Sequence, residues 1–304
     1  MKLKKFINSR YRSIILNSDW YNSMFTDCKK FWNGFHMGLD IVNLGSTSSV
    51  YAFSYDDVDK KCANWAMRPQ TLYADFLILQ NYCSYLKPGS VVLIPLCPFS
   101  SLSSPRYLTK GVDRYFTMLA PESIWPFSLE KYNKMMDIKN NPKRYYPVAA
   151  LRKDLVHILK KDTREYSISP NQFEQDALSR IEGWKSEFSI LDFSNPMRLH
   201  NKDMFETGVG VLREMIEFCR EREYKPVIVI PPVTKQLAEK LPTYARKKYM
   251  YEFVREGNVA QIPLLDYFDD VRFQKEEWFR DSLLMNNEGA KVFTKQVMID
   301  AQVW

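Results

Sequence analysis

The feature that most constrains the fold is a series of apolar runs of strand length that alternate with segments of helical spacing. The clearest run, Ser90-Val-Val-Leu-Ile-Pro-Leu96, has the continuous hydrophobicity of a central parallel strand. Other strand-like runs lie at 39–45, 62–67, 226–231 and 262–266, and helical spacing lies at 70–86, 203–222, 234–256 and 287–299. This alternation predicts an α/β fold, a three-layer α/β/α sandwich with a five-stranded parallel sheet.

Residues 98–200 interrupt this alternation. The Ser- and Pro-rich stretch 98–105 has loop chemistry, whereas 148–161 and 171–187 have the spacing of amphipathic helices. We expect a largely helical insertion or lid at 98–200, within one α/β domain that spans 1–304. The mixed, aromatic stretch 1–36 predicts one or two short helices.

The net charge of +7 limits the classes of partner that we expect the protein to bind. Basic residues lie in short, dispersed patches, and no arginine-rich run alternates with aromatic residues, so we expect no nucleic-acid partner. The excess charge indicates either a solvated basic surface or attraction to anionic ligands. Ligands of this kind are a nucleotide-sugar, a phosphorylated glycan and acidic lipid heads.

Cysteine and histidine usage argues against a metal or redox centre. The cysteines lie far apart without CxxC spacing, which is typical of free thiols in a reducing compartment, and the histidines show no ligand spacing. We expect no metal and no cofactor. No apolar run approaches the roughly 18 residues that span a bilayer, and no signal-peptide core is present, so we expect no transmembrane segment and a cytoplasmic protein.

The end of the first strand is a candidate ligand site, because ligands bind at the carboxyl ends of strands in open parallel sheets. Gly45 permits a sharp turn there, and Ser46, Thr47 and Ser48 follow it with hydroxyl groups near a helix N-terminus. Two interpretations remain open. These side chains either contain a nucleophile or form a helix cap and a cradle for an anion.

Five segments in order resemble a bacterial SGNH (GDSL-type) hydrolase-like group. They are Val42-Asn-Leu-Gly-Ser-Thr, Ala63-Asn-Trp-Ala, Leu86-Lys-Pro-Gly-Ser-Val-Val-Leu-Ile-Pro, Tyr224-Lys-Pro-Val-Ile-Val-Ile-Pro-Pro-Val-Thr and Phe279-Arg-Asp-Ser-Leu-Leu-Met-Asn-Asn-Glu-Gly-Ala-Lys. They cover most of the chain outside the insertion. The resemblance implies a flavodoxin-like sheet and a site built from serine, histidine and aspartate.

Carried over position by position, the resemblance puts Thr47 at the nucleophile and Asp281 at the aspartate. Leu284 stands at the position of the family's histidine. Asn286 and Gly289 also match the family's block, and they fix the register of this alignment. The oxyanion donors of the family correspond to the backbone of Ala66 and to Cys97, where the family has an asparagine. An isobutyl group cannot take a proton from a nucleophile. Loss of the histidine base lowers kcat on the order of a millionfold in a comparable hydrolase.

The resemblance therefore implies a divergent or inactive relative of acyl esterases and acetyl-ester hydrolases. Its expected setting is the modification of bacterial surface polysaccharide, with an acylated sugar or glycan as ligand. The alternative is an active esterase in which Thr47, Ser46 or Ser48 attacks and His157 or His200 supplies the base. A third alternative is a protein that binds an acylated sugar without turnover.

Other residues near the predicted site also have two interpretations. Asp281 either retains a vestigial catalytic role or caps its turn and pairs with Arg280. Arg68, just beyond the second strand, is a candidate contact for an anionic ligand. Trp65 and Trp184 fit core packing better than sugar platforms. His36 precedes the first strand and is expected at the opposite edge of the sheet.

Overall fold

The computed structural model describes residues 2–102, 112–160, 167–193 and 195–303. The chain forms two compact units. The helical unit comprises residues 1–35 and 109–164, and the sheet unit comprises 36–108 and 165–304. These bounds differ from the single domain with an insertion at 98–200 that the sequence predicts, since 165–200 belong to the sheet unit and 1–35 group with 109–164.

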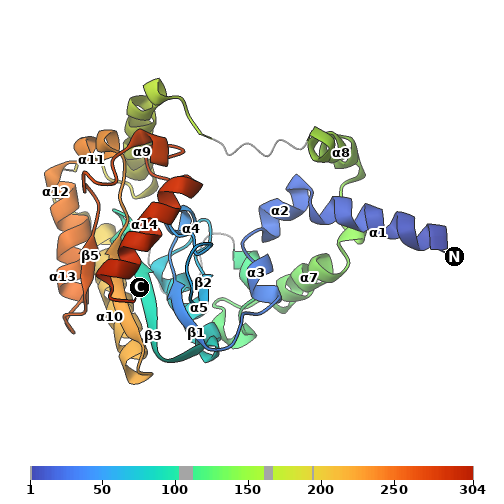
Figure 1. Ribbon diagram of the computed structural model, residues 1–304, viewed down its shortest axis with the longest axis horizontal. Coiled ribbons are helices and arrows are strands. Elements are labelled where there is room, and N and C mark those ends of the chain that lie inside the picture. The colour runs from blue at the N-terminus through green and yellow to red at the C-terminus, as the bar shows by residue number, and fades with distance from the viewer. Residues whose placement is uncertain (1, 103–111, 161–166, 194, 304) are drawn as a thin grey trace. The chain divides into compact units, whose positions relative to one another are not determined.

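The sheet unit is built on five parallel strands in the order β2-β1-β3-β4-β5 (Figure 1). This is the flavodoxin-like order, in which the switch point lies between β1 and β3. The prediction of a five-stranded parallel sheet is confirmed. The strands are β1 (Leu39–Asn43), β2 (Cys62–Asn64), β3 (Leu86–Pro95), β4 (Lys225–Ile230) and β5 (Leu264–Asp266).

The start of β3 lies earlier than the sequence predicts. The predicted helix 70–86 forms α5 (Leu72–Tyr82), which is followed by one short turn, and Leu86 already pairs with Leu39 of β1. The register then shifts, so that Ile41 pairs with Val91. Gly89 lies inside this irregular stretch with a φ of +80°, a conformation that glycine adopts without steric cost.

Alternate strand residues point to opposite faces of the sheet. On one face, side chains of β1, β3 and β4 form a core with the last helix, α14 (Asn287–Asp300), which contributes Phe293, Val297 and Met298. Helix α4 (Thr47–Ala52) packs against α14, and α10 (Leu199–Glu221) packs against both α5 and β4. Helices therefore sandwich the sheet, in agreement with the predicted α/β/α architecture.

The described part of the sheet unit also contains helical segments that connect and cover the strands. They are α4 (Thr47–Ala52), α5 (Leu72–Tyr82), α9 (Phe173–Glu187), α10 (Leu199–Glu221), α11 (Lys235–Lys240), α12 (Thr243–Ala245), a π-helical stretch (Arg246–Glu252), α13 (Phe253–Gly257) and α14 (Asn287–Asp300). Short 3-10 turns lie at Cys83–Tyr85, Ser100–Leu102, Pro170–Gln172 and Glu276–Trp278.

The described part of the helical unit contains helices and connecting turns. Its helices are α1 (Lys2–Leu16), α2 (Asp19–Phe25), α3 (Lys29–Trp32), α6 (Val112–Tyr115), α7 (Leu129–Asn140) and α8 (Leu151–Lys160), with 3-10 turns at Pro121–Ser123, Pro142–Arg144 and Val148–Ala150. Ser18 caps α2 by accepting a hydrogen bond from the Tyr21 amide, and Ser128 caps α7 in the same way. Buried aromatic rings such as Tyr21, Phe25 and Phe116 fill its interior.

A bilayer-spanning helix is not found among the described residues, since none of their helices combines the required length with sufficient hydrophobicity.

Candidate functional site

The loop after β1 lies at the carboxyl edge of the sheet, and the strand order places the switch point there. Gly45 has a φ of +113°, which favours glycine, and a Cβ atom built there would lie 2.2 Å from Ser49 Oγ. Ser46 is the residue before α4, and Thr47 is the first residue of the helix. The close approach of the glycine backbone to Ser49 lets the chain turn from β1 directly into α4.

A buried carboxylate holds this loop in place. Asp75 of α5 is 4 % exposed, and its Oδ1 accepts a hydrogen bond of 2.8 Å from the Gly45 amide. The side-chain amide of Gln70 also donates to Asp75, and the Gln70 backbone amide donates to Ser46 Oγ at 3.0 Å. Neither Asp75 nor Gln70 was predicted from the sequence. The available signal was an acidic residue beside the apolar positions of the predicted helix 70–86.

Ser48 and Cys97 meet across the switch point. Ser48 Oγ lies 3.1 Å from Cys97 Sγ, and the Cys97 amide donates to Ser100 Oγ at 2.8 Å. Ser48 is buried, whereas Thr47 and Cys97 are half-buried. The structure thus brings together two residues that the sequence assigned to the nucleophile loop and to an oxyanion position. A thiol stands beside the hydroxyl, and a thiol is no general base for it.

Burial raises the pKa of the Cys97 thiol above its ordinary value, although hydrogen bonds with Ser48 and Ser100 oppose the rise. Because the thiolate is the reactive form, we expect Cys97 to react slowly with iodoacetamide at neutral pH in the folded protein. The rate should increase as the pH rises, because the thiolate fraction grows. Mass spectrometry of peptides from folded and urea-denatured protein measures this difference, and equal rates in the two states would contradict it.

The backbone amide of Ala66, the predicted oxyanion donor, is already engaged. It donates to Asn64 Oδ1 at 3.0 Å. The same oxygen accepts from the side chain of Asn43, which in turn accepts from the Tyr55 hydroxyl. An oxyanion hole requires donors aimed at the reacting carbonyl, and this donor is directed to a neighbouring amide instead.

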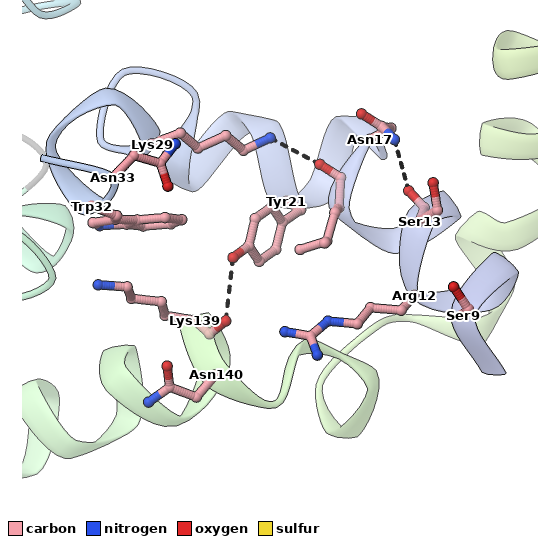
Figure 2. Close-up of a pocket in the computed structure, with 11 residues that line it drawn as sticks. Ser9, Arg12, Ser13, Asn17, Tyr21, Lys29, Trp32, Asn33, Lys139 and Asn140 are labelled. Carbon is pink, nitrogen blue, oxygen red and sulfur yellow. Dashed lines mark hydrogen bonds between the residues drawn. The ribbon is translucent and has the colours of Figure 1, made fainter. Parts of the chain in front are cut away.

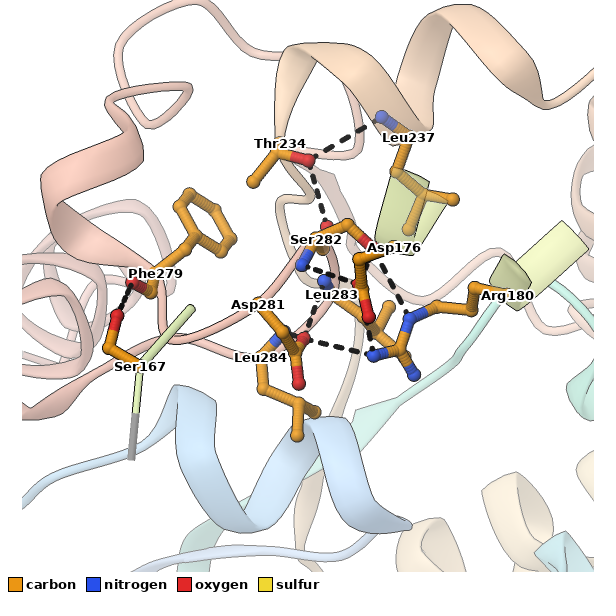
Figure 3. A network of polar contacts seen from close by, with 10 residues as sticks. All are labelled: Ser167, Asp176, Arg180, Thr234, Leu237, Phe279, Asp281, Ser282, Leu283 and Leu284. Carbon is orange, nitrogen blue, oxygen red and sulfur yellow. Dashed lines mark hydrogen bonds and ion pairs between the residues drawn. The ribbon is translucent and has the colours of Figure 1, made fainter. Parts of the chain in front are cut away.

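Asp281, the predicted aspartate, caps its own turn. Its Oδ1 accepts from the amides of Leu283 at 2.9 Å and Leu284 at 2.8 Å, and it forms an ion pair of 3.1 Å with Arg180 (Figure 3). The predicted capping role is therefore present. The ionic partner is Arg180 of α9, a residue about a hundred positions away, whereas the sequence pointed to the neighbouring Arg280.

Arg180 belongs to a polar network that fixes the loop 280–284. Its Nε donates to Ser282 Oγ at 3.3 Å, and its guanidinium also lies 3.4 Å from Asp176. The Ser282 amide donates to Asp176 at 3.0 Å, and both the amide and the hydroxyl of Thr234 donate to the Ser282 carbonyl. Three elements, α9, the loop before α11 and the loop before α14, converge on this turn.

The side chain of Leu284, which the resemblance aligns with the family's histidine, points towards α4 in Figure 3. The Leu284 carbonyl accepts from the Arg280 amide at 2.9 Å, which closes the turn. Asn286 caps α14 by accepting from the Gly289 amide at 3.0 Å. The turn that contains Arg280 and Leu284 thus lies beside α4, where Arg280 approaches the Tyr51 ring.

Two of the histidines, His36 and His200, have side chains within the described part of the chain. His36 is exposed and precedes the start of β1, and His200 is exposed in the first turn of α10. Within the described part of the chain, neither forms a hydrogen bond or an ion pair with Ser46, Thr47 or Ser48. The side chain of His157 lies outside the described residues.

Two guanidinium groups flank a tyrosine beside the site. Arg68 lies 5.5 Å and Arg280 lies 4.3 Å from the ring centroid of Tyr51 in α4, and the Tyr51 hydroxyl accepts from Arg68 at 2.6 Å. Both arginines are half-buried. Both guanidinium groups thus lie beside α4, and the contact of Arg68 with an anionic ligand stays a prediction.

Trp65 and Trp184 have the packing role that the sequence favours. Trp65 is fully buried, and Trp184 packs against Phe99 with a centroid distance of 5.2 Å. In the described residues, no group of three His, Cys, Asp or Glu side chains is arranged to hold a metal ion.

Comparison of the sequence with models of known protein families and with curated proteins found no match.

Proposed function

We propose that the protein is a relative of SGNH-type acyl esterases that binds its ligand at the carboxyl edge of the sheet without hydrolysing it. One observation carries this proposal. The Asp281 carboxylate is committed to two backbone amides and to the Arg180 guanidinium, and Leu284 stands where a base would be needed. A serine hydrolase requires that carboxylate to orient a histidine, which then accepts the proton of the nucleophile.

The charges near the site suggest which ligand would bind. Arg68 and Arg280 place two cations beside Tyr51, and Ser46 and Thr47 add hydroxyl groups at the start of α4. A glycan that carries acyl and acidic groups suits this mixture of donors. A role in the modification of bacterial surface polysaccharide follows from the sequence resemblance and is part of the same proposal.

We expect purified protein to hydrolyse 4-nitrophenyl acetate no faster than a matched protein control. The physical reason is the missing base, because loss of the base alone lowers kcat on the order of a millionfold in a comparable hydrolase. Release of 4-nitrophenol, followed by absorbance, measures the rate. The variants Ser46→Ala, Thr47→Ala and Ser48→Ala should leave the residual rate unchanged.

Robust turnover that one of these three substitutions abolishes would overturn the proposal and favour the active esterase. In that case, His157→Ala and His200→Ala identify which histidine acts as the base. A ligand-binding measurement completes the test. Calorimetry with an O-acetylated, acidic oligosaccharide should give a binding signal that Arg68→Gln weakens, because a guanidinium contact is lost.

A further inference from the structure

The helical unit contains a cavity of about 660 Å³ between α1, α2, α3 and α7 (Figure 2). This volume lies within the usual range of ligand pockets. Three cationic side chains line it, Arg12, Lys29 and Lys139, and the remaining lining residues are hydroxyl, amide, aromatic or aliphatic. None of the lining residues is a carboxylate. The cavity is therefore electropositive, and it is built by a different unit from the carboxyl edge of the sheet.

Much of the hydrogen-bonding capacity of these cations is unused within the described part of the chain. Lys29 Nζ donates to the Leu16 carbonyl at 2.9 Å and to Asn22 Oδ1 at 2.7 Å, which leaves one donor of its ammonium group. Lys139 Nζ donates to the Thr117 carbonyl at 3.2 Å, which leaves two. Arg12 is exposed and forms no ion pair or hydrogen bond with any described residue.

Two of the three cations, Lys29 and Lys139, lie against aromatic rings. Lys139 Nζ lies 4.6 Å from the centroid of the Trp32 ring, and Lys29 Nζ lies 5.3 Å from the centroid of Tyr21. Figure 2 shows the Arg12 guanidinium directed towards the end of the cavity where the Tyr21 hydroxyl contacts the Lys139 carbonyl. Desolvation lowers the pKa of both Lys29 and Lys139, as expected for ammonium groups that no carboxylate neutralises.

The distribution of charge along the chain also indicates that the ligand of this cavity is an anion. The helical unit contains 19 Lys and Arg against 8 Asp and Glu, whereas the sheet unit contains 24 against 28. The entire positive excess of the protein therefore lies in the unit that forms the cavity. A neutral ligand would gain nothing from this concentration of charge, whereas an anion is attracted by it.

We propose that this cavity binds a phosphate-bearing ligand, with Arg12, Lys29 and Lys139 contacting its anionic oxygens. Cations distributed over three helices fit a ligand with more than one negative group, such as a diphosphate. The planar guanidinium of Arg12 suits two oxygens of one phosphate, and each ammonium group provides a point charge. Phosphate of this kind occurs both on free metabolites and on lipid headgroups.

The test is calorimetry of the full chain with inorganic pyrophosphate, at constant ionic strength and with chloride as the reference anion. We expect pyrophosphate to bind, and Arg12→Gln and Lys139→Gln each to weaken it by about tenfold or more, because each removes a charge-assisted contact. The matched control is Lys134→Gln, which removes an exposed charge of α7 outside the cavity and should leave affinity within about twofold. Circular dichroism verifies the fold of each variant, and exposed Arg12 is the substitution least able to disturb it.

A second arm separates the two sources of phosphate. Vesicles of phosphatidylcholine, with and without phosphatidylglycerol, are sedimented with the protein in the presence and absence of pyrophosphate. Pyrophosphate binding without retention on either vesicle supports a free phosphorylated ligand, and retention that pyrophosphate displaces supports a lipid headgroup. The proposal is overturned if pyrophosphate gives no signal beyond chloride, or if Lys134→Gln weakens binding as much as Arg12→Gln does. These outcomes are independent of ester hydrolysis, so they do not test the sheet-edge site.

Discussion

Replacing Gly45 with alanine is expected to lower the free energy of unfolding by roughly 3 kcal/mol or more, because two costs combine. The first is backbone strain, since a φ of +113° is unfavourable for a residue with a Cβ atom. The second is overlap, since the new Cβ would lie 2.2 Å from Ser49 Oγ and 2.7 Å from Ser49 Cβ. Urea denaturation followed by circular dichroism measures the loss.

Two other glycines of the sheet unit separate these costs. Gly89 has a φ of +80° with open space around its Cα, so Gly89→Ala should cost only the strain, about 1 kcal/mol. Gly183 lies inside α9 with ordinary φ and open space, so Gly183→Ala should stabilise the protein by about 0.5–1 kcal/mol. A Gly45→Ala effect no larger than that of Gly89→Ala would show that the contact with Ser49 yields without cost.

A second substitution tests the contact itself. Ser49 is fully buried, and within the described part of the chain its hydroxyl has no hydrogen-bond partner. Ser49→Ala should therefore be close to neutral in the native background. In the Gly45→Ala background it should recover part of the loss, because Oγ is removed while Cβ remains. The two substitutions should thus show a favourable coupling energy.

The sheet could be predicted from sequence because its signals are local. The runs that become β1, β3 and β4 are long, apolar and bounded by glycine, proline or charge, so their type is unambiguous. The predicted helix 234–256 is interrupted near Pro242, a residue that cannot continue a regular helix. The structure divides it into α11, α12, a π-helical stretch and α13, and local composition does not indicate this subdivision.

The helical unit could not be predicted in the same way. Its two segments are separated by most of the parallel sheet, and amphipathic helices show which face is apolar but not which partner covers it. For example, the Trp32 indole donates to Thr117 Oγ1, a residue 85 positions away. Contacts over such separations leave no periodic pattern in the sequence.

The same limit explains what was missed at the candidate site. The end of the first strand placed Gly45 and Ser46 at the carboxyl edge of the sheet, and the family resemblance added Asp281 to the same site. The sequence did not indicate that Asp75 would bind the Gly45 amide or that Arg180 would pair with Asp281. Arg180 lies on α9 among many other polar residues, so only the fold selects it. Asp75 is the one acidic residue of the largely apolar α5, but this isolation does not indicate which group it binds.

Asp281 holds the turn before α14, and its replacement by alanine is expected to destabilise the protein by about 2–3 kcal/mol. The substitution leaves the Leu283 and Leu284 amides without their acceptor and the Arg180 guanidinium without one of its carboxylates. The estimate is below the full value for a buried pair because Arg180 retains 24 % exposure and the contact to Asp176. Chemical denaturation provides the measurement.

Asp281→Asn separates the charge from the hydrogen bonds. The amide oxygen still accepts from Leu283 and Leu284, so the loss should fall to about 1 kcal/mol. An exposed pair, Glu217 with Arg220, provides the matched control, and Glu217→Gln should change stability by no more than about 0.5 kcal/mol. If Asp281→Ala costs as little as this control, the carboxylate does not hold the turn. A carboxylate retained for catalysis gives the opposite pattern, in which Asp281→Asn removes esterase activity while stability hardly changes, so the two measurements together decide between a structural and a catalytic aspartate.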